Sequence, residues 1–191
     1  MSCDSEFHWT CAARTDIGLV RSRNEDAYLA LPERGLWAVA DGMGGHAFGD
    51  LASRAVVDAL AGLAAPASMA GFINAARARL NEVNDALRGE ARARSVPVMG
   101  STVVVLLACG RETACLWAGD SRIYLVRGGR LQQLTRDHSQ AEELRACGDC
   151  GKAADELIAL ALANGGRDNI TAIVVRADDM SADTTMLNPA L

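Results

Sequence analysis

Residues 36–49 read LWAVADGMGGHAFG, an apolar segment that ends on Asp41 and continues into a glycine-rich loop. The apolar run 36–40 predicts a β-strand. The glycines between positions 42 and 49 argue against a long stretch of regular structure there. An acid at the end of a buried strand is held on a rigid support, so this segment predicts a sheet with a polar site at its edge.

The flanking sequence predicts further strands and a small set of helices. Short glycine-containing turns join several successive strands, which implies antiparallel pairing. Apolar residues at helical spacing predict two long helices after the glycine-rich loop, the second capped by Ser68. The predicted strands are 9–14, 27–31, 36–40, 102–108, 113–118, 122–127, 131–135 and 170–175, and the predicted helices are 50–64, 68–94, 140–146 and 153–163. This order of elements predicts an α+β fold with antiparallel sheet packed against helices.

Composition narrows the class of protein. The chain has 191 residues and a net charge of −5, which suits one globular domain and disfavours nucleic acid as a partner. Residues 1–10 contain two acids and no apolar run, and no segment is long and apolar enough to span a membrane. We therefore expect a cytoplasmic protein whose six cysteines are reduced thiols.

Acidic residues recur where predicted strands begin or end. Any single Asp in such a place is more often a turn residue than a ligand. Together, however, the acids would repel one another unless cations lay between them, and all-oxygen ligands suit Mg²⁺, Mn²⁺ or Ca²⁺. These positions are Glu25, Asp26, Asp41, Asp120 and Asp168. Gly42 would let a backbone carbonyl approach an ion closely.

Six short motifs occur in a fixed order along the chain. They are RSRNEDA (21–27), VADGMGG (39–45), GST (100–102), AGDSRIYL (118–125), TRDHS (135–139) and GGRDNITAIVV (165–175). In this order they resemble the PPM family, the type 2C protein phosphatases in their bacterial form. The resemblance implies an antiparallel β-sandwich flanked by helices, in α-β-β-α layers, over residues 8–176, with a tail at 177–191. It also implies a centre of two Mn²⁺ or Mg²⁺ ions at one end of the sandwich.

The resemblance assigns metal-binding roles by position. Asp41 resembles the ligand that bridges both metals, and Gly42 the residue that offers its carbonyl to the first. Asp168 and Glu25 resemble ligands at the second metal. Asp120 resembles the acid associated with a weaker third metal.

Other residues receive supporting roles from the same resemblance. Arg21 matches the arginine that grips the substrate phosphate, and Asp26 a group that orients metal-bound water. Asn169 is expected to contact the metal ligands rather than the metals themselves. His46, in the glycine-rich loop, is either a proton donor or a plain loop residue.

One departure from the family pattern concerns the second metal. The family carries a Ser-Asp-Gly motif between the TRDHS and GGRDN segments, and its Asp is a ligand of that metal. Residues 140–157 of this chain, QAEELRACGDCGKAADEL, contain no Asp-Gly pair. We therefore expect a domain that is incomplete between about 140 and 157, a sandwich truncated in one sheet and a weak second metal site. Asp149 is the one candidate to replace the missing ligand.

Two main functions follow from these features. The first is metal-dependent hydrolysis of phosphoserine and phosphothreonine in proteins, opposing a bacterial Ser/Thr kinase and acting on its targets. The alternative is a catalytically weak or inactive phosphatase-like module that binds phosphoproteins or regulates a kinase. The missing Asp-Gly pair favours the alternative, whereas the intact Arg21, Glu25, Asp26, Asp41 and Asp168 favour the enzyme.

Overall fold

The computed structural model describes residues 7–44, 48–64, 66–135 and 149–179. Its elements are β1 (Phe7–Asp16), β2 (Asp26–Leu31), η1 (Pro32–Arg34), β3 (Leu36–Met43), α1 (Gly49–Ala61), α2 (Met69–Ala93), β4 (Gly100–Ser101), β5 (Val103–Cys109), β6 (Glu112–Ala118), β7 (Tyr124–Arg127), β8 (Arg130–Gln133), α3 (Cys150–Ala163) and β9 (Ile170–Asp179). Each predicted strand and helix within the described ranges is present.

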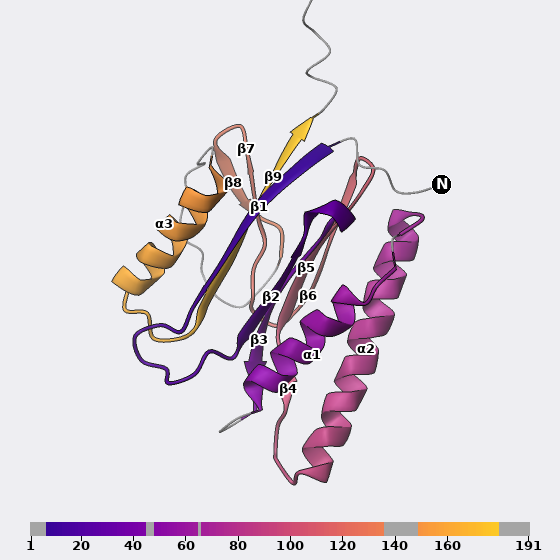
Figure 1. Ribbon diagram of the computed structural model, residues 1–191, viewed down its shortest axis with the longest axis vertical. Helices are drawn as coiled ribbons and strands as arrows, with labels where there is room; N and C mark the ends of the chain where they lie inside the picture. The colour runs from indigo at the N-terminus through magenta and orange to yellow at the C-terminus, as the bar shows by residue number, and fades with distance from the viewer. Residues whose placement is uncertain (1–6, 45–47, 65, 136–148, 180–191) are drawn as a thin grey trace, which may run out of the picture.

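The larger sheet runs in the order β2-β3-β5-β6, and β4 pairs with the end of β3. All of these pairs are antiparallel. Helices α1 and α2 cover one face of the sheet (Figure 1). Alternate residues of β3, namely Leu36, Ala38 and Ala40, join the buried cluster beneath these helices. This alternation follows from the two-residue period of a strand.

The second layer is an antiparallel ladder of β1 and β9. It extends from the pair Phe7 and Asp179 to the pair Asp16 and Ile170. Helix α3 packs against both strands on the side away from the larger sheet (Figure 1). Between the layers, the rings of Trp9 and Trp37 lie 5.2 Å apart. The predicted α-β-β-α layering is therefore confirmed.

The second layer is narrow. In the ranges that the structure describes it contains two strands, and these pack over β2 and β3 of the larger sheet. Trp117 on β6 remains 43% exposed.

Three predicted details of the strands differ from the structure. The pairing expected between the strands at 113–118 and 122–127 is wrong, because β7 pairs with β8 in a separate hairpin closed by Gly128 and Gly129. Both glycines have positive φ, as a tight hairpin turn requires.

Two strands extend further than predicted. β3 continues into the glycine-rich segment because β4 pairs with Gly42 and Met43. β9 reaches Asp179, beyond the expected start of the tail at 177, because β1 offers partners that far. The predicted helix 140–146 lies outside the described residues.

Two expectations from composition can be compared with the structure. No helix in the described part of the chain combines the length and the apolar character needed to cross a bilayer. Cys11, Cys115 and Cys150 are free thiols. Cys109 carries a disulfide, against the expectation that every cysteine is reduced.

Candidate functional site

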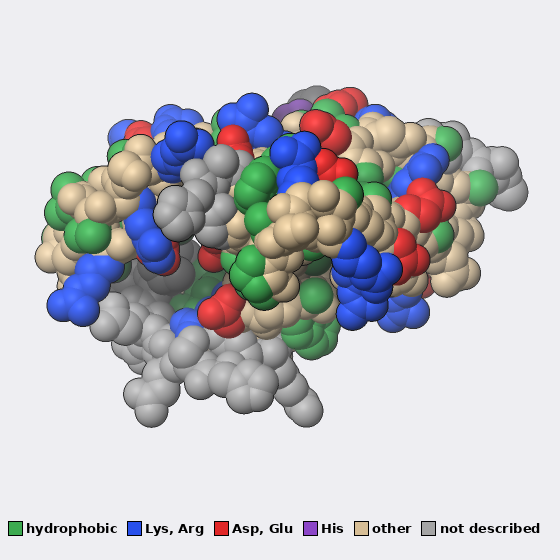
Figure 2. All heavy atoms as spheres, turned by 90° about the horizontal axis from the view of Figure 1, so that it is seen from below, with side chains coloured by type: hydrophobic (Ala, Val, Ile, Leu, Met, Phe, Trp, Pro, Cys, Tyr) green, Lys and Arg blue, Asp and Glu red, His purple; other side chains and the backbone are tan. Residues whose placement is uncertain are grey.

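The strand pairing brings the predicted acidic residues to one end of the molecule. Asp26 begins β2 and lies directly opposite Asp41 on β3. Asp120 follows β6 at the same end, because the end of β6 pairs with the start of β5. Asp168 precedes β9, whose first residue pairs with the last residue of β1. Figure 2 views the molecule from this lower end and shows acidic and basic side chains around a hollow.

Thr102 fixes the position of Asp41. The Asp41 N–H donates to the Thr102 hydroxyl at 3.3 Å, and the Thr102 N–H donates to the Asp41 carbonyl at 2.8 Å. The Thr102 hydroxyl also shares a 2.8 Å hydrogen bond with that of Ser121, next to Asp120. Sequence reasoning gave Thr102 and Ser121 no role, although both lie in the quoted motifs. They link the two segments that carry Asp41 and Asp120.

The other acids lie near enough to Asp41 to repel its charge. Partial burial, followed by repulsion from Asp26, Asp168, Asp120 and Glu25, raises the pKa of Asp41 to about 6. Asp41 keeps an exposed side, so solvent reaches the cluster. Burial also raises the pKa of Asp26, against the opposing effect of a hydrogen bond from Thr171. Crowded carboxylates of this kind favour a bound cation.

Two glycines make room for Glu25 beside the start of α1. The Gly42 N–H donates to the Glu25 carbonyl at 3.1 Å. A Cβ atom on Gly49 would lie 2.5 Å from the carboxylate carbon of Glu25, and one on Gly42 would lie 1.9 Å from the Gly49 carbonyl oxygen. The helix N-terminus favours an anion at this position. Glycine at 42 and 49 is therefore what allows the carboxylate of Glu25 to lie there.

A chain of hydroxyl groups orients Asp26. The Thr171 hydroxyl donates to Asp26 Oδ2 at 2.5 Å and shares a 2.8 Å hydrogen bond with the Thr15 hydroxyl. Asn24 Nδ2 donates to Thr15 Oγ1 at 2.8 Å, while Asn24 Oδ1 accepts from the Asp26 N–H. Asp26 is thus held from the second layer as well as from its own loop. The DNIT segment carries Thr171, but only the packing of the two layers reveals its partner.

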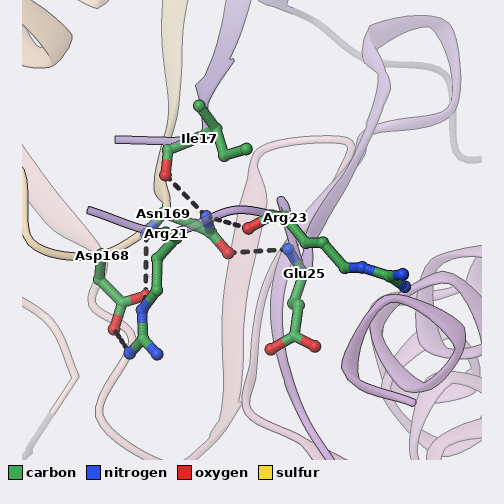
Figure 3. A network of polar contacts seen from close by, with 6 residues as sticks. All are labelled: Ile17, Arg21, Arg23, Glu25, Asp168 and Asn169. Atoms are coloured by element: carbon green, nitrogen blue, oxygen red, sulfur yellow. Dashed lines mark hydrogen bonds and ion pairs between the residues drawn. The ribbon is translucent and has the colours of Figure 1, made fainter. Parts of the chain in front are cut away.

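Asn169 connects three backbone groups behind the acids (Figure 3). Its Oδ1 accepts from the Glu25 N–H at 2.7 Å. Its Nδ2 donates to the carbonyls of Ile17 and Arg23 at 2.9 and 2.8 Å. This arrangement fixes the loop that carries Arg21 and Glu25 against the start of β9.

Replacing Asn169 by alanine should loosen this loop. We expect Asn169→Ala to reduce the free energy of unfolding by about 2 kcal/mol, because three backbone groups lose their partner. Chemical denaturation of the metal-free protein measures this. Asn81→Ala, on the exposed face of α2, is the matched control and should be neutral. Equal stability of the two variants would contradict a supporting role for Asn169.

Arg21 and Asp168 form a two-pronged ion pair (Figure 3). Arg21 Nε donates to Oδ1 at 2.8 Å and Nη2 donates to Oδ2 at 2.7 Å. The hydrogen bonds from Arg21 are the main reason that the pKa of Asp168 is lowered. Gly18 has φ +79°, and its Cα packs against the carbonyl of Asp168 so closely that a Cβ atom would clash. The neighbouring Leu19 N–H donates to the Gly166 carbonyl, so the two loops are fixed side by side.

The donor chemistry of these residues fits a hard divalent cation, because every side chain in the cluster offers carboxylate oxygen. Within the described ranges, however, no three His, Cys, Asp or Glu side chains are gathered at metal-binding geometry. Asp168 faces Arg21, and the guanidinium takes the place of a cation on that carboxylate.

Two further candidates do not join the cluster. His46 lies outside the described residues. Asp149 caps α3, where its carboxylate accepts from the N–H groups of Gly151 and Lys152. The start of α3 contacts Thr10, six residues from Asp16 along β1, which corresponds to about 20 Å. Asp149 therefore does not replace the missing ligand.

Comparisons with known proteins agree with this architecture. The sequence model of the protein phosphatase 2C family matches residues 20–175 of this chain. The serine/threonine protein phosphatase PstP of Mycobacterium tuberculosis is 38% identical over 134 residues, covering 70% of this chain and 26% of PstP. The chain therefore belongs to the protein phosphatase 2C family.

Solved structures show the same fold. PppA, described as a key regulatory component of T6SS in Pseudomonas aeruginosa, matches with a TM-score of 0.83 and 37% identity, over 90% of this chain and 98% of that one. The catalytic domain of PstP in complex with two manganese ions matches with a TM-score of 0.73 and 30% identity, over 90% and 99%. The chain spans between 26% and 58% of the length of the curated relatives that it matches first.

Proposed function

We propose that this chain is a Mn²⁺- or Mg²⁺-dependent phosphatase that hydrolyses phosphoserine and phosphothreonine in proteins. The observation that carries the proposal is that the strand ends bring Asp26 directly opposite Asp41, with Glu25, Asp120 and Asp168 near enough to add, after burial, to the raised pKa of Asp41. Family membership supports it, and so does the manganese found in the related PstP structure. The substrates would be phosphoproteins made by a bacterial Ser/Thr kinase.

Different residues would bind the cations, orient water and bind the phosphate. Asp41, Glu25 and Asp168, with the carbonyl of Gly42, would hold two cations, and Asp120 a weaker third. When bound, the cations acidify water and neutralise charge on the phosphoryl oxygens. Asp26, held by Thr171, would orient water for attack. Arg21 would grip the phosphate with its planar, permanently charged fork.

Metal dependence tests the proposed function. Chelator-treated protein should hydrolyse p-nitrophenyl phosphate only after Mn²⁺ or Mg²⁺ is added back, and should then release phosphate from phosphoserine and phosphothreonine peptides. Protein that binds the phosphopeptides but shows no turnover at any metal concentration would favour the alternative, an inactive phosphatase-like module.

The second cation should be bound more weakly than the first. Residues 140–157 lack an Asp-Gly pair, and Asp149 lies at the far end of α3 from the cluster. With one anionic ligand fewer, water would complete the coordination and attract the ion less. Calorimetry should therefore resolve one tight and one weak Mn²⁺ site, and turnover should rise without an early plateau. Two equally tight sites would contradict this prediction.

A further inference from the structure

We propose that Arg21 has a second role, as the internal counter-ion of Asp168, which it must release before a cation can bind there. Arg21 would then couple the metal site to the phosphate site. This inference rests on the proposed function and concerns the same site.

The geometry of the pair leaves Asp168 little capacity for another partner. Both carboxylate oxygens accept from the guanidinium, at 2.8 and 2.7 Å. Oδ1 also accepts from the Asn169 N–H at 2.9 Å. A cation that approached Asp168 would meet the positive charge of Arg21 as well as occupied oxygens, so the two compete for one carboxylate.

The pair is suited to exchange because it is exposed. The side chains of Arg21 and Asp168 are 55% and 61% exposed. Ion pairs in such surroundings contribute little to stability, so a ligand of moderate affinity can separate them. In the metal-free protein, Glu25 and Asp41 also attract the guanidinium, though less than Asp168 does.

The backbone around the pair is held in place. The Leu19 N–H bonds the Gly166 carbonyl at 2.7 Å, and Asn169 bonds the carbonyls of Ile17 and Arg23. The exchange therefore needs a rotation of the Arg21 side chain and no movement of the loops. A phosphate group offers Arg21 another two-pronged partner while a cation takes Asp168. Binding of either ligand then favours the other, and by thermodynamic linkage the effect is reciprocal.

Calorimetric titration of the full chain with Mn²⁺ alone tests this competition. We expect Arg21→Ala to tighten the weaker site about 5-fold. This is the gain in affinity expected when Mn²⁺ no longer has to break an exposed ion pair in order to bind. Arg21→Lys keeps the charge but loses the planar fork, and should tighten this site about 2-fold. Arg23→Ala is the matched control, since its side chain points away from Asp168 in Figure 3, and should change the affinity by less than about 2-fold.

Thermal denaturation gives a second measurement. Mn²⁺ should raise the melting temperature of Arg21→Ala more than that of the parent at equal concentration, because tighter binding to the folded state stabilises it more. If Arg21→Ala does not fold, Arg21→Gln, which also removes the charge but keeps most of the side chain, takes its place, and no tightening of the weaker site in that variant overturns the inference.

The outcomes separate this inference from the proposed function. Parent protein that binds Mn²⁺ and turns over substrate, with Arg21→Ala binding no more tightly, overturns the inference and leaves the phosphatase proposal standing. Equal tightening by Arg23→Ala also overturns it, because the effect would then be one of overall charge. If neither the parent nor any variant binds Mn²⁺, both proposals fail. Binding by Arg21→Ala alone would support the inference most directly.

Discussion

Asp41→Asn is expected to lower phosphomonoester turnover by roughly a thousand-fold or more, because the amide removes the charge shared by the cations. The amide keeps the size of the side chain, and the backbone bonds of Asp41 to Thr102 are unaffected. Steady-state hydrolysis of p-nitrophenyl phosphate at saturating Mn²⁺ measures the loss. Asp58→Asn, on the exposed face of α1, removes the same charge away from the site and should keep full activity. Activity of Asp41→Asn near that of the parent would contradict the role given to Asp41.

Although Asp41→Asn should lose activity, its free energy of unfolding without metal should not fall. The pKa of Asp41 is raised to about 6 in the folded chain, above the ordinary value of 3.8. A raised carboxyl pKa means that the folded state favours the protonated form, so the stability contributed by Asp41 falls as the pH rises from about 4 to about 6. At pH 7 and without metal, Asp41→Asn should therefore be at least as stable as the parent. A large loss of stability on denaturant titration would show that the lost activity reflects misfolding.

Gly42→Ala should have the largest effect on stability. The added Cβ would lie 1.9 Å from the Gly49 carbonyl oxygen and 2.9 Å from that of Glu25. Both contacts are with backbone, so strand β3 or the start of α1 must move. We expect a loss of at least about 3 kcal/mol in the free energy of unfolding, at or above the upper end for overpacked positions.

Gly89→Ala is the matched control for this variant. Gly89 lies inside α2, and nothing lies within 4 Å of the position of its Cβ. Alanine favours helix over glycine by up to about 1 kcal/mol, so Gly89→Ala should be neutral or stabilising. Urea titration of both variants measures the difference. If Gly42→Ala is as stable as Gly89→Ala, the close approach of β3 to α1 is not required.

Local sequence patterns predicted most of the secondary structure. The apolar run before Asp41, the helical spacing after the glycine-rich loop and the Ser68 cap each describe a segment by its own residues. Ser68 does accept from the Gly71 N–H at 3.1 Å. The predicted pairing of β7 with β6 was wrong. A short turn shows that the chain reverses its direction, but it does not show which strand the next segment pairs with.

The sequence by itself determined which chemical groups this protein has and that they lie at strand ends. Period-two strands and short turns leave few ways to arrange Asp26 and Asp41 other than side by side. Only the tertiary structure decided which side chains meet across the two layers. Arg21 binds Asp168, Thr171 binds Asp26 and Asn169 binds the Glu25 backbone, each across more than 140 residues of chain. The tertiary structure also decided that Asp149 lies at the end of α3 that is far from the acidic cluster. Contacts of this kind depend on how loops pack between layers, and no local periodicity encodes that packing.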